Sequence, residues 1–128
     1  MALDTTMSVL VVDDYTTMRR IIRNLLRRID LYNVDEAEDG AEALAKLREI
    51  RFGLVISDWN MEPMTGLQLL QEVRADPGLA ATPFIMITAE NKAGNVLAAR
   101  QAGVSSYIIK PFNAETLRSK IEGVFNHG

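Results

Sequence analysis

The sequence has no cysteine and a single histidine among its 128 residues. Disulfide bonds, thiolate metal sites and cysteine nucleophiles are therefore excluded. No apolar stretch approaches the roughly 20 residues of a membrane span, and the start, MALDTTM, has no apolar run that would form a signal peptide. These absences predict a cytoplasmic protein that does not insert into a membrane.

Basic residues are also outnumbered, with 14 Lys and Arg against 17 Asp and Glu, which gives a formal net charge of −3. A nucleic-acid-binding protein requires a positive surface, so we expect no nucleic-acid partner. Hydrophobic residues make up 48% of the chain, enough for a core at this length. Because no linker, repeat or low-complexity tract interrupts it, we predict one domain over residues 1–128 and no output domain.

Short apolar runs alternate with stretches of helical periodicity along the chain. The runs SVLVV, GLVIS and TPFIMIT predict buried strands, SSYIIK predicts another, and the polar segment NVDEAE is the least strand-like of the five. A glycine, Gly103, is suited to end the fourth helix, and the arginines of the first helix are interpreted as its solvated face. The alternation predicts an α/β fold whose parallel sheet is covered by helices on both faces. The predicted strands are residues 8–12, 33–38, 53–57, 82–88 and 105–110, and the predicted helices are 18–29, 43–50, 66–74, 92–102 and 114–125.

Charged and hydroxyl side chains stand where four of the predicted strands end. They are Asp13, Asp14, Asp58, Thr88 and Lys110. Each one alone would be explained as a helix cap, a turn residue or a solvated strand end. Open α/β sheets, however, bind ligands beyond the carboxyl ends of their strands, so we expect all five side chains to share one site.

Three carboxylates at one place repel one another, and a divalent cation relieves that repulsion. Because the group contains no histidine or cysteine, its oxygen ligands favour Mg²⁺. Mg²⁺ accepts phosphate oxygens beside one or two carboxylates, and an aspartate can attack phosphorus. The pattern therefore predicts that Asp58 accepts a phosphoryl group, while Mg²⁺, Lys110 and Thr88 stabilise the charge on the transferred oxygens.

In this order, these residues resemble the receiver domain of two-component response regulators, and particularly the single-domain regulators of chemotaxis. The resemblance spans essentially the whole chain and rests on VVDDYTTMRRIIRNLL, EAEDG, VISDWNM, TAE and KPF. It implies a flavodoxin-like (βα)5 fold, a doubly wound five-stranded parallel sheet with the strand order 2-1-3-4-5.

The resemblance also implies a metal site and a phosphoacceptor. Asp58 is the expected phosphoacceptor. Asp13, Asp58 and the main-chain carbonyl of Asn60 are expected to hold Mg²⁺, and Asp14 is expected to act through a bound water.

Further implied roles surround the phosphoryl group. Thr88 and Lys110 are expected to contact it, together with the backbone N–H groups of Asn60 and Ala89. Tyr107 matches an aromatic switch position, whose ring turns inward as Thr88 moves toward the phosphate.

Two finer expectations concern the rate of dephosphorylation and the backbone. Asn60 and Glu90 match positions that tune hydrolysis of the phosphate. The Lys110–Pro111 peptide bond is expected to be cis.

One segment departs from the family pattern. The family usually has proline four residues after the phosphoacceptor, whereas this chain has Glu62 there, followed by Pro63, and Thr65 precedes Gly66. Glu62 adds negative charge near an acidic site, so we hypothesise an altered affinity for Mg²⁺.

The expected function is a phosphorylation-activated signalling switch rather than an enzyme, with Mg²⁺-dependent self-phosphorylation from small phosphodonors and autodephosphorylation. A histidine kinase is the expected phosphodonor. The flagellar motor switch protein is the leading expected partner, a phosphatase is a further candidate, and the chain is expected to be a monomer.

Two alternatives stay open, and a third is excluded. A stand-alone receiver could serve as a phosphate sink or a phosphorelay intermediate. An aspartate-nucleophile phosphatase of the haloacid-dehalogenase-like class would carry Asp-x-Asp after the first strand, but here Asp13 and Asp14 are adjacent. A flavin-binding flavodoxin is excluded because the loop DDYTTM is acidic and lacks glycine, so it would repel a flavin phosphate.

Overall fold

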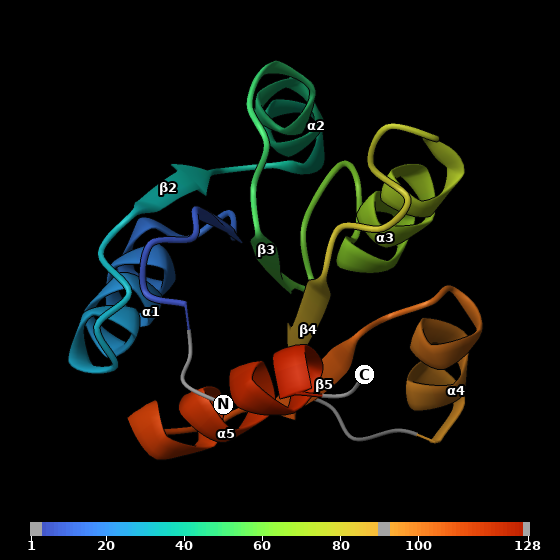
Figure 1. Cartoon of the computed structure of the whole chain (residues 1–128). Coiled ribbons are helices and arrows are strands. Elements are labelled where there is room, and N and C mark those ends of the chain that lie inside the picture. Colours follow the sequence, from blue (N-terminus) through green and yellow to red (C-terminus); the bar gives the residue numbers. More distant parts are fainter. Residues whose placement is uncertain (1–3, 90–92, 127–128) are drawn as a thin grey trace.

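The computed structural model describes residues 4–89 and 93–126, in which strands and helices alternate (Figure 1). No helix within these residues is long and apolar enough to cross a membrane. The strands are β1 (Val9–Val12), β2 (Val34–Ala37), β3 (Leu54–Asp58), β4 (Phe84–Thr88) and β5 (Ser106–Ile109). The helices are α1 (Thr16–Arg28), α2 (Gly40–Glu49), α3 (Gly66–Ala75), α4 (Ala93–Gln101) and α5 (Ala114–Asn126).

All five strands form one parallel sheet in the order β2-β1-β3-β4-β5, which confirms the predicted doubly wound fold. The chain first moves from β1 to β2 on one side and then crosses back to β3 on the other. The carboxyl ends of β1 and β3 are therefore neighbours at the point where the strand order reverses, which is where open α/β sheets bind ligands.

The core lies on both faces of the sheet. Val9 and Val11 of β1 pack with apolar residues of α1 and α5, whereas Leu10 and Val12 pack with those of α2 and α3. Figure 1 shows the same division, with α1 and α5 on one side of the sheet and α2, α3 and α4 on the other. Because both faces are covered, β1, β3 and β4 are buried along their whole length, and up to the polar residues at the carboxyl ends of β3 and β4 their sequences are apolar without alternation.

The polar segment NVDEAE forms the edge strand β2, and one of its carboxylates pairs with arginines of α1. Glu36 of β2 forms ion pairs with Arg19 and Arg23 of α1, and the Arg19 Nε lies 2.9 Å from Glu36 Oε1. The interpretation of the α1 arginines as a solvated face is therefore wrong for Arg19, while the Arg23 side chain stays 40% exposed. Arg19 in particular is nearly buried, with 12% of its side chain exposed.

The end of α4 is fixed by its glycine, as the sequence predicts. Gly103 has a φ of 90°, a left-handed conformation that glycine adopts without steric cost. The backbone N–H groups of Gly103 and Val104 donate to the carbonyls of Arg100 and Ala99, which closes the last turn and directs the chain into β5.

Candidate phosphoacceptor site

The strand ends bring the predicted site residues to one edge of the sheet. Val12 is paired with Ser57 and Asp58 with Ile87, so the residues that follow β1 and end β3 and β4 lie together. Asp13, Asp58 and Thr88 are all buried there. Polar side chains are rare in such positions unless they are paired or functional.

Three carboxylates converge at this edge. Oxygen atoms of Asp13, Asp14 and Asp58 lie within 4.8 Å of one another, a geometry that could hold a metal ion. Asp14 is exposed at the rim, while Asp13 and Asp58 are 1% and 4% exposed. Within the described part of the chain, Asp13 Oδ2 and Asp58 Oδ1 are buried oxygens that accept no hydrogen bond. Buried, unsatisfied anionic oxygens are the donor set that a hard cation prefers.

The electrostatics of Asp13 reflect this crowding. Burial is the main cause that raises the pKa of the Asp13 carboxyl to about 6, and the charges of Asp58 and Asp14 add to the rise. The Tyr15 N–H, which donates to Asp13 Oδ1 at 2.9 Å, and the Lys110 ammonium both lower the pKa and offset part of the rise. The carboxylate form of Asp13 is thus disfavoured until a cation compensates it.

Lys110 supplies the single cation found inside the site among the described residues. Its Nζ lies 2.9 Å from Asp58 Oδ1, but the contact lacks the alignment of a hydrogen bond and is an ion pair by distance. The Lys110 backbone N–H donates to the Thr88 carbonyl at 2.8 Å, which fixes the end of β5 beside that of β4. The next peptide bond, Lys110–Pro111, is cis.

Arg19 is a site-supporting residue that the sequence did not single out. Its Nη1 donates to the main-chain carbonyl of Asp13 at 2.6 Å while its Nε binds Glu36. The guanidinium therefore ties the β1–α1 loop to β2. No side chain caps α1 at its N-cap, Tyr15, so the helix-cap interpretation of Asp14 has no support.

The loop that departs from the family pattern is closed at its base. The Gly66 N–H donates to the Trp59 carbonyl at 2.9 Å, and a Cβ on Gly66 would lie 2.2 Å from the Asp58 carbonyl oxygen. Thr65 then starts α3 with a capping box formed with Gln68. The loop also contains a second cis peptide bond, at Glu62–Pro63.

The remaining predicted residues occupy different settings. Asn60 and Ala89 are exposed beside the site, and Tyr107 is partly buried on β5. Glu90 lies outside the described residues. The Trp59 ring, next to Asp58 in sequence, meets the Tyr107 ring edge-on, with a centroid separation of 6.4 Å and an interplanar angle of 72°.

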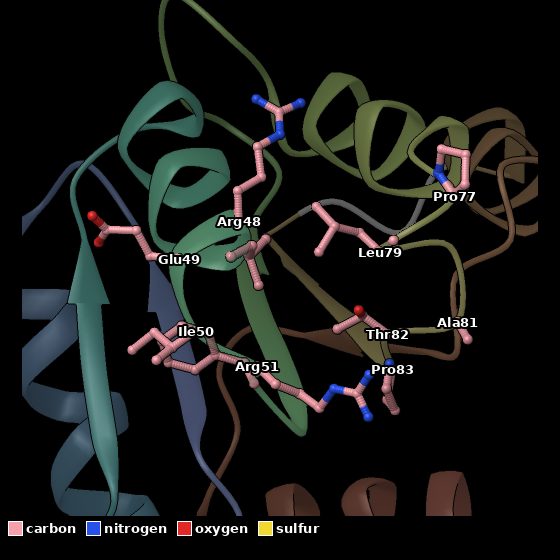
Figure 2. Close-up of a pocket in the computed structure, with 12 residues that line it drawn as sticks. Arg48, Glu49, Ile50, Arg51, Pro77, Leu79, Ala81, Thr82 and Pro83 are labelled. Carbon is pink, nitrogen blue, oxygen red and sulfur yellow. The ribbon is translucent and has the colours of Figure 1, made fainter.

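One hollow of the surface lies away from this site. It has a volume of about 570 Å³ and is lined by residues 47–52 and by residues of the 77–83 segment (Figure 2). These segments precede β3 and β4, so the hollow lies at the amino ends of the strands. None of the predicted site residues lines this hollow. The convergence of Asp13, Asp14 and Asp58 therefore identifies the site better than the size of a cavity does.

Comparison with known proteins agrees with the geometry. The family model for the response regulator receiver domain matches residues 9–122. The chain belongs to the response regulator receiver domain family. As a receiver domain, it is 50% identical over 119 residues to the chemotaxis protein CheY of Pseudomonas aeruginosa, covering 93% of this chain and 96% of that protein. It is also 48% identical over 123 residues to CheY-3 of Vibrio cholerae, covering 96% and 95%.

Solved structures of receiver domains have the same fold. CheY4 of Vibrio cholerae superposes with a TM-score of 0.86 at 37% identity, covering 93% of this chain and 99% of the other. A response regulator receiver protein of Pseudomonas putida gives a TM-score of 0.83 at 27% identity, covering 95% and 98%. Membership of this family, with chemotaxis proteins among its relatives, supports a phosphorylation-activated signalling switch.

Proposed function

We propose that this receiver domain accepts a phosphoryl group on Asp58 from a histidine kinase, with Mg²⁺ bound beside it. One observation carries the proposal: Asp58 and Asp13 present buried oxygens that accept no hydrogen bond from any described residue, while the ammonium of Lys110 approaches Asp58 at 2.9 Å. A purely structural site would pair these charges fully, whereas a site for a cation and a phosphoryl group leaves oxygens available.

The residues present fit Mg²⁺. Asp13 and Asp58 would hold the ion directly, the main-chain carbonyl of Asn60 would complete the protein ligands, and Asp14 would act through a water. When bound, the ion would neutralise negative charge on the phosphoryl oxygens. These donors are all oxygen, as Mg²⁺ prefers.

The chain's own side chains would perform the transfer. An oxygen of Asp58 would form the new bond to phosphorus while the bond between phosphorus and the donor's histidine nitrogen breaks, so that the electron pair stays with the imidazole. Lys110 is close enough to follow the charge from the carboxylate to the phosphoryl oxygens. Thr88 and the N–H groups of Asn60 and Ala89 would donate to these oxygens.

The signal would leave by protein–protein contact. We propose a cytoplasmic, monomeric signalling protein rather than an enzyme, with self-phosphorylation from small donors as a side activity. Two relatives at 50% and 48% identity are chemotaxis proteins, which supports the flagellar motor switch as the partner. The proposed output surface comprises α4, β5 and α5, where Leu97 and Ile109 are exposed.

Intact-mass measurement after incubation with acetyl phosphate and Mg²⁺ tests the proposal. We expect one labile phosphoryl adduct in the wild type and none in Asp58→Asn. An adduct on both proteins, or on neither, would contradict the assignment of Asp58.

A pull-down with purified motor switch protein, with and without beryllofluoride, tests the output. Retention that requires beryllofluoride supports the motor role. Phosphorylation without retention, followed by rapid transfer to a histidine phosphotransfer protein, would instead establish a phosphate sink or relay.

A further inference from the structure

The hollow between residues 47–52 and the 77–83 segment lies at the opposite end of the sheet from the acidic cluster (Figure 2). The first of these segments closes α2 and leads into β3, and the second leads from α3 into β4. Asp58 and Thr88 end the same two strands. The length of β3 and β4 therefore separates this amino-end hollow from the phosphoacceptor.

The floor of the amino-end hollow is apolar. Leu47, Phe52 and Leu79 line it, and each is buried as part of the core cluster shared by α2 and α3. Ile50 stands beside them with 56% exposed, more than any other leucine or isoleucine that the structure describes. Apolar surface that borders a hollow stays in contact with water until a partner covers it, so association that buries Ile50 is favoured.

Two guanidiniums flank this floor (Figure 2). Arg51 extends along the hollow toward Thr82 and Pro83, whereas Arg48 extends toward the space between α2 and α3. The carboxylate of Glu49, which also belongs to the lining, points away from the 77–83 segment. The charged groups directed at the hollow are therefore positive.

The positive charge of these arginines is only partly compensated. Arg51 forms no ion pair or hydrogen bond through its side chain with any residue that the structure describes. Arg48 contacts Asp76 through its Nε alone, at 3.2 Å, and its side chain stays 54% exposed. The chain as a whole has a formal net charge of −3. An acidic partner is thus attracted to the amino-end hollow and repelled by the aspartates at the other end of the sheet.

We propose that the amino-end hollow is a docking site for a short acidic segment of a partner protein, in which apolar side chains alternate with carboxylates. An apolar side chain would lie on Leu79 and against Ile50, while carboxylates would accept hydrogen bonds from Arg48 and Arg51. A phosphate backbone fits less well, because it would leave the apolar floor exposed to water. The site is independent of the phosphorylation proposed for Asp58, since it shares no residue with the acidic cluster.

Amide NMR of the isotope-labelled full chain tests the docking site with three synthetic peptides. The probe is an acetylated, amidated heptapeptide of alternating glutamate and leucine. One matched peptide replaces glutamate with glutamine and removes the charge, and the other replaces leucine with serine and removes the apolar side chains. We expect saturable shifts in residues 47–53 and 78–82 with the probe, and much weaker binding of both matched peptides. Higher ionic strength should weaken the probe as well.

Variants of the hollow should weaken the probe by different amounts. Arg51→Gln removes one exposed charge pair, which corresponds to roughly a 2- to 5-fold loss of affinity. Ile50→Ser removes an apolar side chain that docking would bury by about half of its surface, which corresponds to roughly a 4- to 12-fold loss. The control is Arg27→Gln, at an exposed arginine of α1 on the other side of the sheet. It changes the net charge equally and should alter the affinity less than about twofold.

Four results would overturn the docking site. They are the absence of saturable shifts in the hollow, shifts that map to the arginines of α1 instead, equal losses in Arg27→Gln and Arg51→Gln, and equal binding of the serine peptide. Shifts of the hollow that depend on protein concentration without any peptide would assign it to a second copy of the chain, which also contradicts an acidic segment. Asp58→Asn should bind the probe as the wild type does, so a failure of docking and a failure of phosphorylation are separate results.

Discussion

The described part of the chain contains two clusters of charged side chains whose charge balance is opposite. At the edge of the sheet, one carboxylate, Glu36, meets two guanidiniums, those of Arg19 and Arg23. At the carboxyl ends of β1 and β3, three carboxylates meet one ammonium, that of Lys110. The two clusters are neighbours, because Arg19 also donates to the Asp13 carbonyl.

The difference in charge balance indicates that the Glu36 cluster has a structural role and the aspartate cluster a functional one. The Glu36 cluster satisfies its carboxylate and fixes α1 on β2, so its contribution is to geometry. The aspartate cluster keeps carboxylates buried beside one another, and the pKa of Asp13 is raised mainly by burial and further by the charges of Asp58 and Asp14. Uncompensated charge of this kind lowers stability and is typical of functional sites.

Removal of Lys110 should have the largest effect on stability, because it takes away the ammonium that faces the three carboxylates. Lys110→Met leaves Asp58 buried beside two other carboxylates, and we expect the metal-free protein to lose about 2–4 kcal/mol of unfolding free energy at pH 7.5. Urea denaturation measures this loss. The half-exposed pair between Lys46 and Asp35 provides the control, since Lys46→Met should cost no more than about 1 kcal/mol. Equal losses in both variants would show that the aspartate cluster is not under-compensated.

Neutralisation of Asp13 should act in the opposite direction. The pKa of Asp13 is about 6 in the folded protein against an ordinary value of 3.8, so the folded state holds its proton more tightly. Ionisation therefore opposes folding, and the stability lost between about pH 4 and pH 6 should reach about 3 kcal/mol and persist above pH 6.

Asp13→Asn should consequently stabilise the metal-free protein by about 1–3 kcal/mol at pH 7.5 and have little effect at pH 4. It should also abolish the stabilisation that Mg²⁺ gives the wild type. Urea denaturation of both proteins across this pH range, with and without Mg²⁺, measures each effect. A variant that is less stable than wild type at pH 7.5 would refute the conclusion that ionisation of Asp13 opposes folding.

Disruption of the Glu36 cluster should have a smaller effect on stability. Arg19→Met keeps much of the apolar stem but loses the bonds to Glu36 and to the Asp13 carbonyl, so we expect about 1–2 kcal/mol of destabilisation. Arg23→Met, whose side chain is 40% exposed, should cost less than about 1 kcal/mol. Chemical denaturation ranks the two, and a larger loss in Arg23→Met would contradict the bridging role of Arg19.

The smallest effect should come from Glu62, which lies outside both clusters in the exposed loop. Glu62→Gln removes one negative charge near the mouth of the site and should weaken Mg²⁺ binding by about twofold or less at low salt. Titration followed by Trp59 fluorescence measures the change. A difference that persists undiminished at high ionic strength would mean that Glu62 is a ligand rather than a screened charge.

The sequence predicted β1, β3 and β4 well because strands buried on both faces are apolar up to their carboxyl ends. β2 was harder, since an edge strand that carries ion pairs on Asp35 and Glu36 resembles a loop. The strand order could not be derived from local patterns, because nothing in a βα repeat specifies on which side the next strand is added. The resemblance to receiver domains supplied it.

The site was predictable to the extent that it depends on topology. Parallel strands place their carboxyl ends at one edge, so the convergence of Asp13, Asp58 and Lys110 followed from their positions in the chain. The partners of Arg19 were not predictable, because a helical arginine has the same local sequence whether it faces solvent or reaches a neighbouring strand. The contact between Trp59 and Tyr107, 48 positions apart in the sequence, likewise requires the packed structure.

Closure of the β3–α3 loop by Gly66 has a consequence for how this protein can diverge. The base of the loop is held by the hydrogen bond from the Gly66 N–H to the Trp59 carbonyl. Position 66 has no room for a side chain, because a Cβ there would clash with the Asp58 carbonyl oxygen.

Within the loop above that base, Met61 is buried in the core and Thr65 caps α3, whereas Glu62 and Pro63 are exposed. Glu62 and Pro63 are therefore the loop positions that can change without moving Asp58. Sequence variation at these two positions should therefore leave the chemistry proposed for Asp58 unchanged.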